Sequence, residues 1–176
     1  MGFFELRTLP FLGDQFVCDI PLRDGAMAHM RLDDELSANE AVVVCDPNRF
    51  LSMWKLSGCR PEVLACEDDW TRDYKFAEAV KGFSHGPDNP VPLADVVFRW
   101  EITPLRYLTG RLGEWRETFE ARPVLDFGNG ITRTIWLLHN GARYFPVECG
   151  REEAPALHKA VGAGPSYLTR DNVPLG

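Results

Sequence analysis

Residues 122–149 read RPVLDFGNGITRTIWLLHNGARYFPVEC, and this stretch decides how the rest of the chain is interpreted. Its first part, residues 123–127, is apolar and β-branched enough to form a buried strand. Gly128 and Gly130 interrupt the strand, and a second apolar run ends at Asn140-Gly141. If that run is a helix, the glycine-rich turn leaves unpaired backbone N–H groups at its start. Such groups, with the positive end of the helix dipole, favour an anion, most often a phosphate.

The apolar run after the turn fits two structures. Leu137 and Leu138 favour a helix, and Arg133 would then lie in its first turn, where the guanidinium would clamp the same anion through two N–H bonds. An Asn-Gly pair between two apolar runs is also a strong hairpin signal, and residues 144–149 have the pattern of a strand. The residues by themselves leave helix and hairpin open.

The same stretch resembles the core of the ParB/sulfiredoxin superfamily, in which a strand leads into a G-x-x-R turn, a helix and a strand containing I/F-P-V. Gly130-Ile131-Thr132-Arg133 stands where ParB proteins carry Gly-Glu-Arg-Arg and sulfiredoxins carry Gly-Cys-His-Arg. Phe127-Gly128 matches the Phe-Gly before the sulfiredoxin motif. Residues 91–96, VPLADV, are similar to the opening I-P-x-x-x-I strand. The resemblance covers residues 90–150 and favours the helix.

Departures from the motif limit what the resemblance implies. Ile131 replaces the sulfiredoxin cysteine, so reduction of a sulfinic acid by a thiol is not expected. The acidic residue of the ParB motif is also missing, which leaves Gly130 and Arg133, the part that handles phosphate. Within the superfamily the chain is most similar to the plasmid fertility-inhibition group, whose members block transfer of another plasmid or of T-DNA. That resemblance implies ATP hydrolysis and DNA cleavage.

Two sets of residues are candidates for this chemistry. The residues expected to seat the phosphate are Gly128, Asn129, Gly130, Thr132 and Arg133. Arg133 would also neutralise the charge that grows on the phosphoryl group. Glu101 follows an apolar strand and Asp126 lies inside the central strand, so either would hold Mg²⁺ or orient water, or would instead pair with Arg133. The sequence gives no set of metal ligands beyond these two.

An α+β fold is predicted for the 176 residues, of which 45% are apolar. The predicted parts are an N-terminal αβ extension at 1–89 packed on a ParB/sulfiredoxin-like core at 90–150, and a C-terminal helix with a loose tail at 151–176. The other predicted elements are strands at 15–22, 26–32 and 41–45, a helix between Asp46-Pro47 and Gly58, a helix at 70–83 capped by Asp68-Asp69, and a helix starting at Thr103-Pro104.

The net charge of −7 argues against broad electrostatic binding to DNA. Residues 1–89 hold nine basic and sixteen acidic residues, whereas residues 90–150 hold seven of each, and all seven bases there are arginines. The acidity therefore lies outside the segment that carries the motif. Any nucleic acid would be held locally by arginines.

Cysteine usage and hydropathy predict a cytoplasmic protein, and the resemblance to plasmid fertility-inhibition factors implies a bacterial one. The five cysteines, 18, 45, 59, 66 and 149, contain no C-x-x-C and are expected to be buried thiols. No run approaches 18 apolar residues, and no basic segment precedes an apolar run at the N-terminus, so neither a membrane span nor a signal peptide is expected. The expected partner is the transferred DNA strand.

Two other functions stay open. The first is a non-catalytic interaction protein that inhibits a transfer or secretion machine by binding one of its proteins, and the acidic extension favours it. The second is a DNA-binding partition-like module, which the negative charge and the lack of a helix-turn-helix pattern disfavour.

Overall fold

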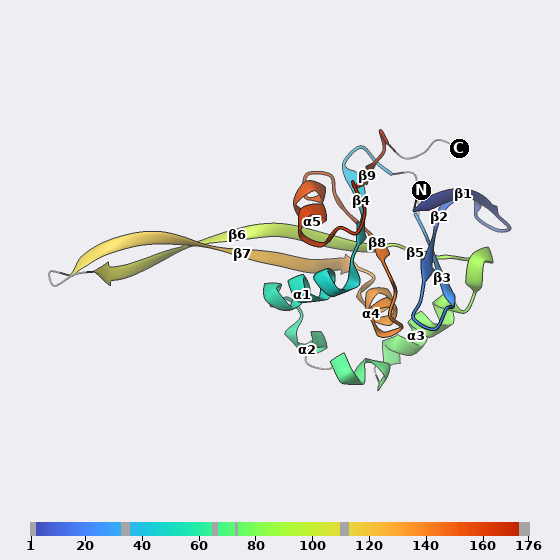
Figure 1. The fold of residues 1–176 in the computed structure, drawn as a ribbon, viewed down its shortest axis with the longest axis horizontal. Coiled ribbons are helices and arrows are strands. Elements are labelled where there is room, and N and C mark those ends of the chain that lie inside the picture. The colour runs from blue at the N-terminus through green and yellow to red at the C-terminus, as the bar shows by residue number, and fades with distance from the viewer. Residues whose placement is uncertain (1–2, 33–35, 65–66, 73, 110–112, 173–176) are drawn as a thin grey trace.

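Two β-sheets, arranged as in Figure 1, and the helices packed against them share one hydrophobic core. The computed structural model describes residues 3–32, 36–64, 67–72, 74–109 and 113–172. One sheet has the strand order β1 (Phe4–Leu9), β2 (Gly13–Pro21), β3 (Met27–Arg31), β5 (Val91–Pro92). The other has the order β7 (Glu114–Asn129), β6 (Ala94–Thr109), β8 (Phe145–Gly150), β4 (Glu40–Cys45), β9 (Leu168–Thr169).

Helices connect and cover the strands, so the predicted α+β class is confirmed. They are α1 (Pro47–Ser57), α2 (Pro61–Leu64), α3 (Tyr74–Phe83), α4 (Ile131–His139) and α5 (Ala154–Val161), with 3₁₀ turns η1 (Glu67–Arg72) and η2 (Gly86–Asp88). In the described part of the chain, no helix has the length and hydropathy needed to span a membrane.

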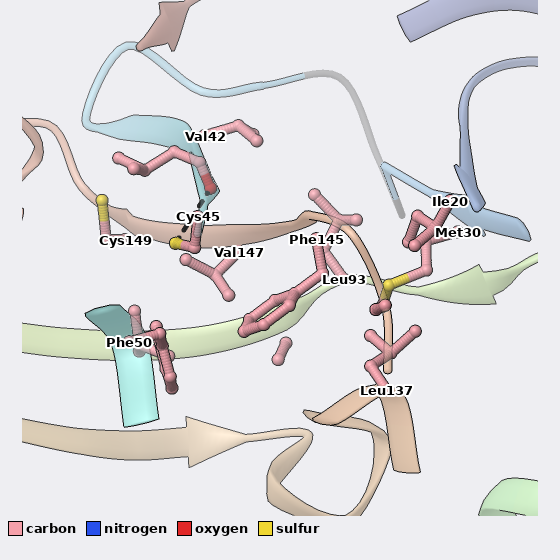
Figure 2. Close-up of a cluster of buried hydrophobic side chains, with 14 of the residues drawn as sticks. Ile20, Met30, Val42, Cys45, Phe50, Leu93, Leu137, Phe145, Val147 and Cys149 are labelled. Atoms are coloured by element: carbon pink, nitrogen blue, oxygen red, sulfur yellow. Dashed lines mark hydrogen bonds between the residues drawn. The ribbon is translucent and has the colours of Figure 1, made fainter. Parts of the chain in front are cut away.

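The core draws side chains from distant parts of the chain. β4 pairs antiparallel with β8, and β6 joins β8 in parallel through Ala94 and Val147. Trp54 of α1 packs edge-on against Phe127 of β7 with ring centroids 4.9 Å apart, and Phe50 packs on Phe145 of β8. Ile20 and Met30 of the four-stranded sheet lie in the same cluster, near Leu93 and Leu137 (Figure 2). A single core therefore fixes both sheets relative to α4.

The run after Gly130 is a helix, as the resemblance indicates. α4 begins at Ile131 and ends at His139, and its Ile135 and Leu137 face the core. The Asn140-Gly141 pair that suggests a hairpin instead closes the helix. Gly141 adopts a positive φ of 66°, and its N–H donates to the Leu138 carbonyl.

The helix predicted at Thr103-Pro104 is wrong, because these residues lie in the long hairpin of β6 and β7. The two strands pair in register from Val96↔Phe127 to Thr109↔Glu114, and the hairpin extends away from the body (Figure 1). Apolar and polar residues alternate along it, which is the period of a strand. This alternation outweighs the local Thr-Pro signal for a helix start.

Three smaller predictions have mixed outcomes. The hairpin across Arg23-Asp24-Gly25 and the Asp46 cap of α1 are confirmed, since the Asp46 carboxylate accepts from the Arg49 N–H at 2.8 Å. The helix predicted at residues 70–83 is wrong in its first part: residues 67–72 form the 3₁₀ turn η1, and α3 starts only at Tyr74. The tail is not loose throughout, because β9 pairs with β4.

Candidate phosphate-binding site

The turn before α4 accepts only a glycine at residue 130. Gly130 has φ 82°, the left-handed region in which a side chain is strained. A Cβ built on Gly130 would lie 2.7 Å from the Cα of Ala94 and 2.8 Å from its Cβ, so β6 leaves no room for it. The Asn129 side-chain oxygen accepts from the Gly130 N–H at 2.7 Å and holds the turn. The backbone of the turn is therefore pressed against the start of β6.

A β-bulge precedes the turn and brings a carboxylate to it. The register shifts between Asp95 and Val96, so that Gly128 is the extra residue of β7. A Cβ on Gly128 would collide with the Asp95 carboxylate, so a larger residue here would displace that side chain. Partial burial raises the pKa of Asp95, and the nearby Glu40 carboxylate raises it further.

The first turn of α4 borders a cavity. The first hydrogen bond within the helix runs from the Thr134 N–H to the Gly130 carbonyl. The N–H groups of residues 131–133 therefore come before the first hydrogen bond of the helix. Ile131 and Thr132 line a cavity of about 520 Å³. Its volume lies in the range of small-molecule sites.

Three bases line this cavity, and two of them pair with carboxylates, Arg60 with Asp126 and Arg72 with Asp69. The residues that line it together with Ile131 and Thr132 are Arg60, Glu62, Val63, Asp69, Trp70, Arg72, Lys75, Phe76 and Ile135. Among them are three bases and two acids. Arg72 pairs with Asp69 at 3.3 Å, but both side chains are largely exposed, so the pair is weakly held. With the partial positive charge of the helix start, the cavity favours an anion.

Arg133 points its guanidinium at the protein backbone. Its Nη1 donates to the carbonyl of Pro92 at 2.6 Å and to that of Leu93 at 3.0 Å. These contacts tie the first turn of α4 to the junction of β5 and β6. Arg133 thus positions the turn, a role that the sequence does not suggest because the two carbonyls lie forty residues earlier.

The two candidate carboxylates lie in different places. Asp126 accepts from Arg60 Nε at 2.9 Å and from the Phe127 N–H at 2.8 Å. Burial alone would raise the pKa of Asp126, but these hydrogen bonds lower it below its usual value. Glu101 pairs with Arg99 at 3.3 Å and with Arg122 at 3.4 Å on the hairpin. It lies six residues along β6 from Asp95, which corresponds to about 20 Å of strand, so the structure does not bring it to the start of α4.

Neither carboxylate is arranged as a metal ligand. Each is engaged by arginine guanidinium groups, whereas Mg²⁺ needs accessible carboxylate oxygens. In the described ranges, no three His, Cys, Asp or Glu side chains form a group that would hold a metal ion.

Three of the thiols, Cys18, Cys45 and Cys149, are buried and are poor nucleophiles. Burial raises the pKa of Cys18 and of Cys149 to about 12, and raises that of Cys45 well above its ordinary value. Cys66 lies outside the described residues.

Sequence reasoning missed four residues of this site: Arg60, Arg72, Lys75 and Asp95. The three bases come from elements whose packing beside α4 has no local signal in the sequence. Asp95 left a signal, because it is a lone acid in the apolar run 91–98. A charged residue in such a run either faces solvent or has a function.

The fold and the site define an α+β protein with a glycine turn that opens a helix beside a cation-lined cavity. A family model described as plasmid fertility inhibition factor matches residues 42–162. The chain belongs to this family of plasmid fertility inhibition factors. The matched range contains the hairpin, the bulge and α4, and the predicted assignment to fertility inhibition is confirmed.

Two known proteins are similar to the chain. Protein osa of Shigella flexneri is 28% identical over 160 residues, which cover 90% of this chain and 74% of that protein. The crystal structure of oncogenic suppression activity protein, a plasmid fertility inhibition factor, in its gold(I) cyanide derivative, aligns with a TM-score of 0.68. At 22% identity, the alignment covers 97% of this chain and 82% of that one, and it supports the fold.

Proposed function

We propose that this fertility inhibition factor hydrolyses ATP and cleaves the transferred DNA strand at the start of α4. We also propose that the G-x-x-R turn is the one found in the ParB/sulfiredoxin superfamily. The observation that supports it most is the first turn of α4, which lies beside a cavity with three cations. Hydrolysis of ATP and of a DNA phosphodiester both require stabilisation of charge on a phosphoryl group.

In the bound state, the N–H groups of residues 131 and 132 donate to phosphate oxygens. Arg72 and Lys75 line the same cavity and neutralise charge on the ligand, and the exposed Arg72 side chain can move toward it. Trp70, Phe76 and Ile135 supply an apolar wall for the nucleoside. The set fits a nucleotide better than an inorganic ion, because it combines apolar and cationic surface.

Two residues prepare the site without binding phosphate. Arg133 holds the turn against β5 and β6 through the Pro92 and Leu93 carbonyls. Asp95, whose carboxylate lies against Gly128 of the turn and whose pKa is raised, is our proposed acceptor for the proton of the attacking water. Glu101 and Asp126 do not fit Mg²⁺ in this geometry, so no step is assigned to the ion.

DNA would be held locally at this site. Arg60, Arg72 and Lys75 contact the strand beside the start of α4, while the surplus of acidic residues in 1–89 repels it from the rest of the surface. The need for ATP and DNA together implies action in the bacterial cytoplasm.

A second candidate function is inhibition by binding alone. The surplus of seven acids in residues 1–89 would suit a basic surface on a protein of the transfer machinery. In that case the phosphate site is vestigial.

Phosphate release by purified protein separates the two candidates. The assay uses ATP with and without Mg²⁺ and single-stranded DNA. The double variant Arg72→Glu with Lys75→Glu should lower release at least tenfold. Lys55→Glu with Lys81→Glu is the matched control, because it changes the charge equally on exposed helix positions outside the cavity, and it should keep the wild-type rate. Absence of release by the wild type under every condition would reject hydrolysis and leave inhibition by binding.

A further inference from the structure

The β6–β7 hairpin has two unlike faces. From the register, one face carries the cross-strand pairs Trp100–Pro123, Ile102–Ala121, Pro104–Phe119, Arg106–Glu117 and Leu108–Trp115, and is called the apolar face below. The opposite face carries mostly charged and hydroxyl residues, among them Glu101, Thr118 and Arg122. Such a division is typical of a sheet with one face buried.

The apolar face continues the core outward. At the base of the hairpin the same face carries Val96, Phe98, Leu125 and Phe127, each at most 6% exposed. Past this base, the hairpin extends away from the body (Figure 1). The side chains that follow are therefore of the kind that the core buries, but one copy of the chain leaves them uncovered.

The exposure on this face is large. Trp100 is 50% exposed and Leu108 57%, while Ile102, Trp115 and Phe119 are 66–68% exposed. A two-stranded ribbon is marginally stable in water by itself, and contiguous apolar surface of this kind marks an interaction site. The hairpin thus needs a second surface over its apolar face.

Charge indicates what kind of surface this is. Arg106 and Glu117 are the charged pair of the apolar face, and they already neutralise each other at 2.7 Å. Residues 99–122 contain five arginines and four glutamates, whereas the whole chain carries −7. A nearly neutral arm does not select a strongly charged partner such as nucleic acid. It fits an equally neutral apolar surface.

The apolar face of a second copy of the chain is such a neutral apolar surface. Pro104–Phe119 is the middle of the five cross-strand pairs. A second copy, packed antiparallel about a two-fold axis at this pair, lays its Leu108–Trp115 pair over Trp100–Pro123. The antiparallel arrangement also holds the two acidic bodies at opposite ends of arms about 30 Å long, beyond the Debye length.

The area is sufficient for a dimer. Each aromatic side chain buries about 150–250 Å² when fully covered. At the observed exposures the apolar face therefore offers on the order of 600 Å² per copy, or about 1,200 Å² for two copies, which is the lower end of specific interfaces. We propose that the chain forms an antiparallel two-fold dimer through the apolar face of the β6–β7 hairpin.

Sedimentation velocity between about 1 and 100 µM tests the proposal. The wild type should change from monomer to dimer over this range. Trp115→Glu with Phe119→Glu should weaken association at least 100-fold. The matched control is Leu105→Glu with Tyr107→Glu, which places two acids on the opposite face of the same strands and should leave the dimer intact.

Circular dichroism checks that each variant is folded. If the double variant Trp115→Glu with Phe119→Glu unfolds, Phe119→Ser in the middle pair is compared with the control variant instead. A wild type that is monomeric throughout, or an apolar-face variant that dimerises as well as the control, would overturn the proposal. DNA binding that the apolar-face variant loses, in a protein that is monomeric throughout, would assign the face to nucleic acid instead.

Discussion

At residue 130, two separate effects require glycine, and substitutions can measure them apart. The positive φ costs any other residue roughly 1 kcal/mol, and the backbone of Ala94 also excludes a Cβ. Gly25 has a similar φ of 87°, but an added Cβ there meets nothing within 4 Å. Gly25→Ala therefore isolates the conformational effect alone.

We expect Gly25→Ala to lower the free energy of unfolding by about 1 kcal/mol and Gly130→Ala to lower it by about 3 kcal/mol. Urea denaturation of both variants measures the difference. Equal losses would mean that the start of β6 yields to a methyl group and that the close approach is not a constraint.

Arg133 links α4 to the β5–β6 junction, so its loss should be felt in stability. Arg133→Ala removes two hydrogen bonds from a charged donor and should cost about 2–3 kcal/mol, which lowers the melting temperature by several degrees. Arg133→Lys should keep part of the stability. Arg143→Ala, at an exposed arginine, is the control. If Arg133→Ala melts like the wild type but no longer binds ATP, Arg133 is a phosphate ligand and not a positioning residue.

Asp95 is expected to oppose folding at neutral pH. Its pKa is higher in the folded protein than in the unfolded chain, so the stability it contributes is present at low pH and is lost as the pH rises through the folded pKa. Asp95→Asn should therefore raise the melting temperature at pH 7, and the difference should shrink in acid. The same variant should lose phosphate release while still binding ATP. A variant that is less stable at pH 7 would contradict the stated burial effect.

The sequence predicted the residues of the turn better than their partners. Gly128 and Gly130 follow from the motif, because a tight turn next to a helix leaves few other choices. The cations Arg60, Arg72 and Lys75 reach the site only through the packing of α2, η1 and α3 beside α4. Such long-range proximity has no signature in a single sequence.

At the scale of elements, prediction worked where a period or a cap was strong and failed where local signals conflicted. The Asp46 cap and the hairpin at Arg23-Asp24-Gly25 are fixed within a few residues, so both were predictable. Thr103-Pro104 resembles a helix start locally, but pairing of residues 94–109 with 114–129 decides the structure. Strand pairing over such distances depends on both partners and overrides local propensity.

The four-stranded sheet contains a cross-strand ion network that makes its stability depend on pH. Arg7 of β1 donates to both carboxylate oxygens of Asp19 on β2, at 2.9 and 2.6 Å, and His29 of β3 lies 2.7 Å from the same carboxylate. The hydrogen bonds from Arg7 are the main cause that lowers the pKa of Asp19. The resulting stability is present above the unfolded pKa and is lost as the pH falls through the folded one.

Asp19→Asn should lower the melting temperature by a few degrees at pH 7 and have little effect near pH 2. Asp171→Asn is the matched control, because Asp171 pairs with Arg151 at a mostly exposed position and should change little at either pH. Thermal melts of both variants at the two pH values measure this difference. An Asp19 effect that persists undiminished in acid would show that the network is not its source.

At the scale of the whole molecule, charge separates three regions. Residues 1–89 carry the net −7, the cavity beside α4 gathers three bases at the start of a helix, and the hairpin is nearly neutral. A phosphate ligand is therefore directed to the cavity, while the hairpin is left for an apolar partner. The composition predicted that residues 1–89 are acidic. It did not predict the cavity, because the cations that line the cavity belong to the same residues 1–89.

Hydrogen exchange with and without ATP tests the central claim, that the first turn of α4 binds phosphate. Saturating ATP should slow exchange of the amides of residues 131–133 and leave residues 115–123 of the hairpin unchanged. Arg72→Glu with Lys75→Glu should show neither ATP binding nor this protection. Protection of other segments only, or ATP binding without any change at residues 131–133, would contradict the account.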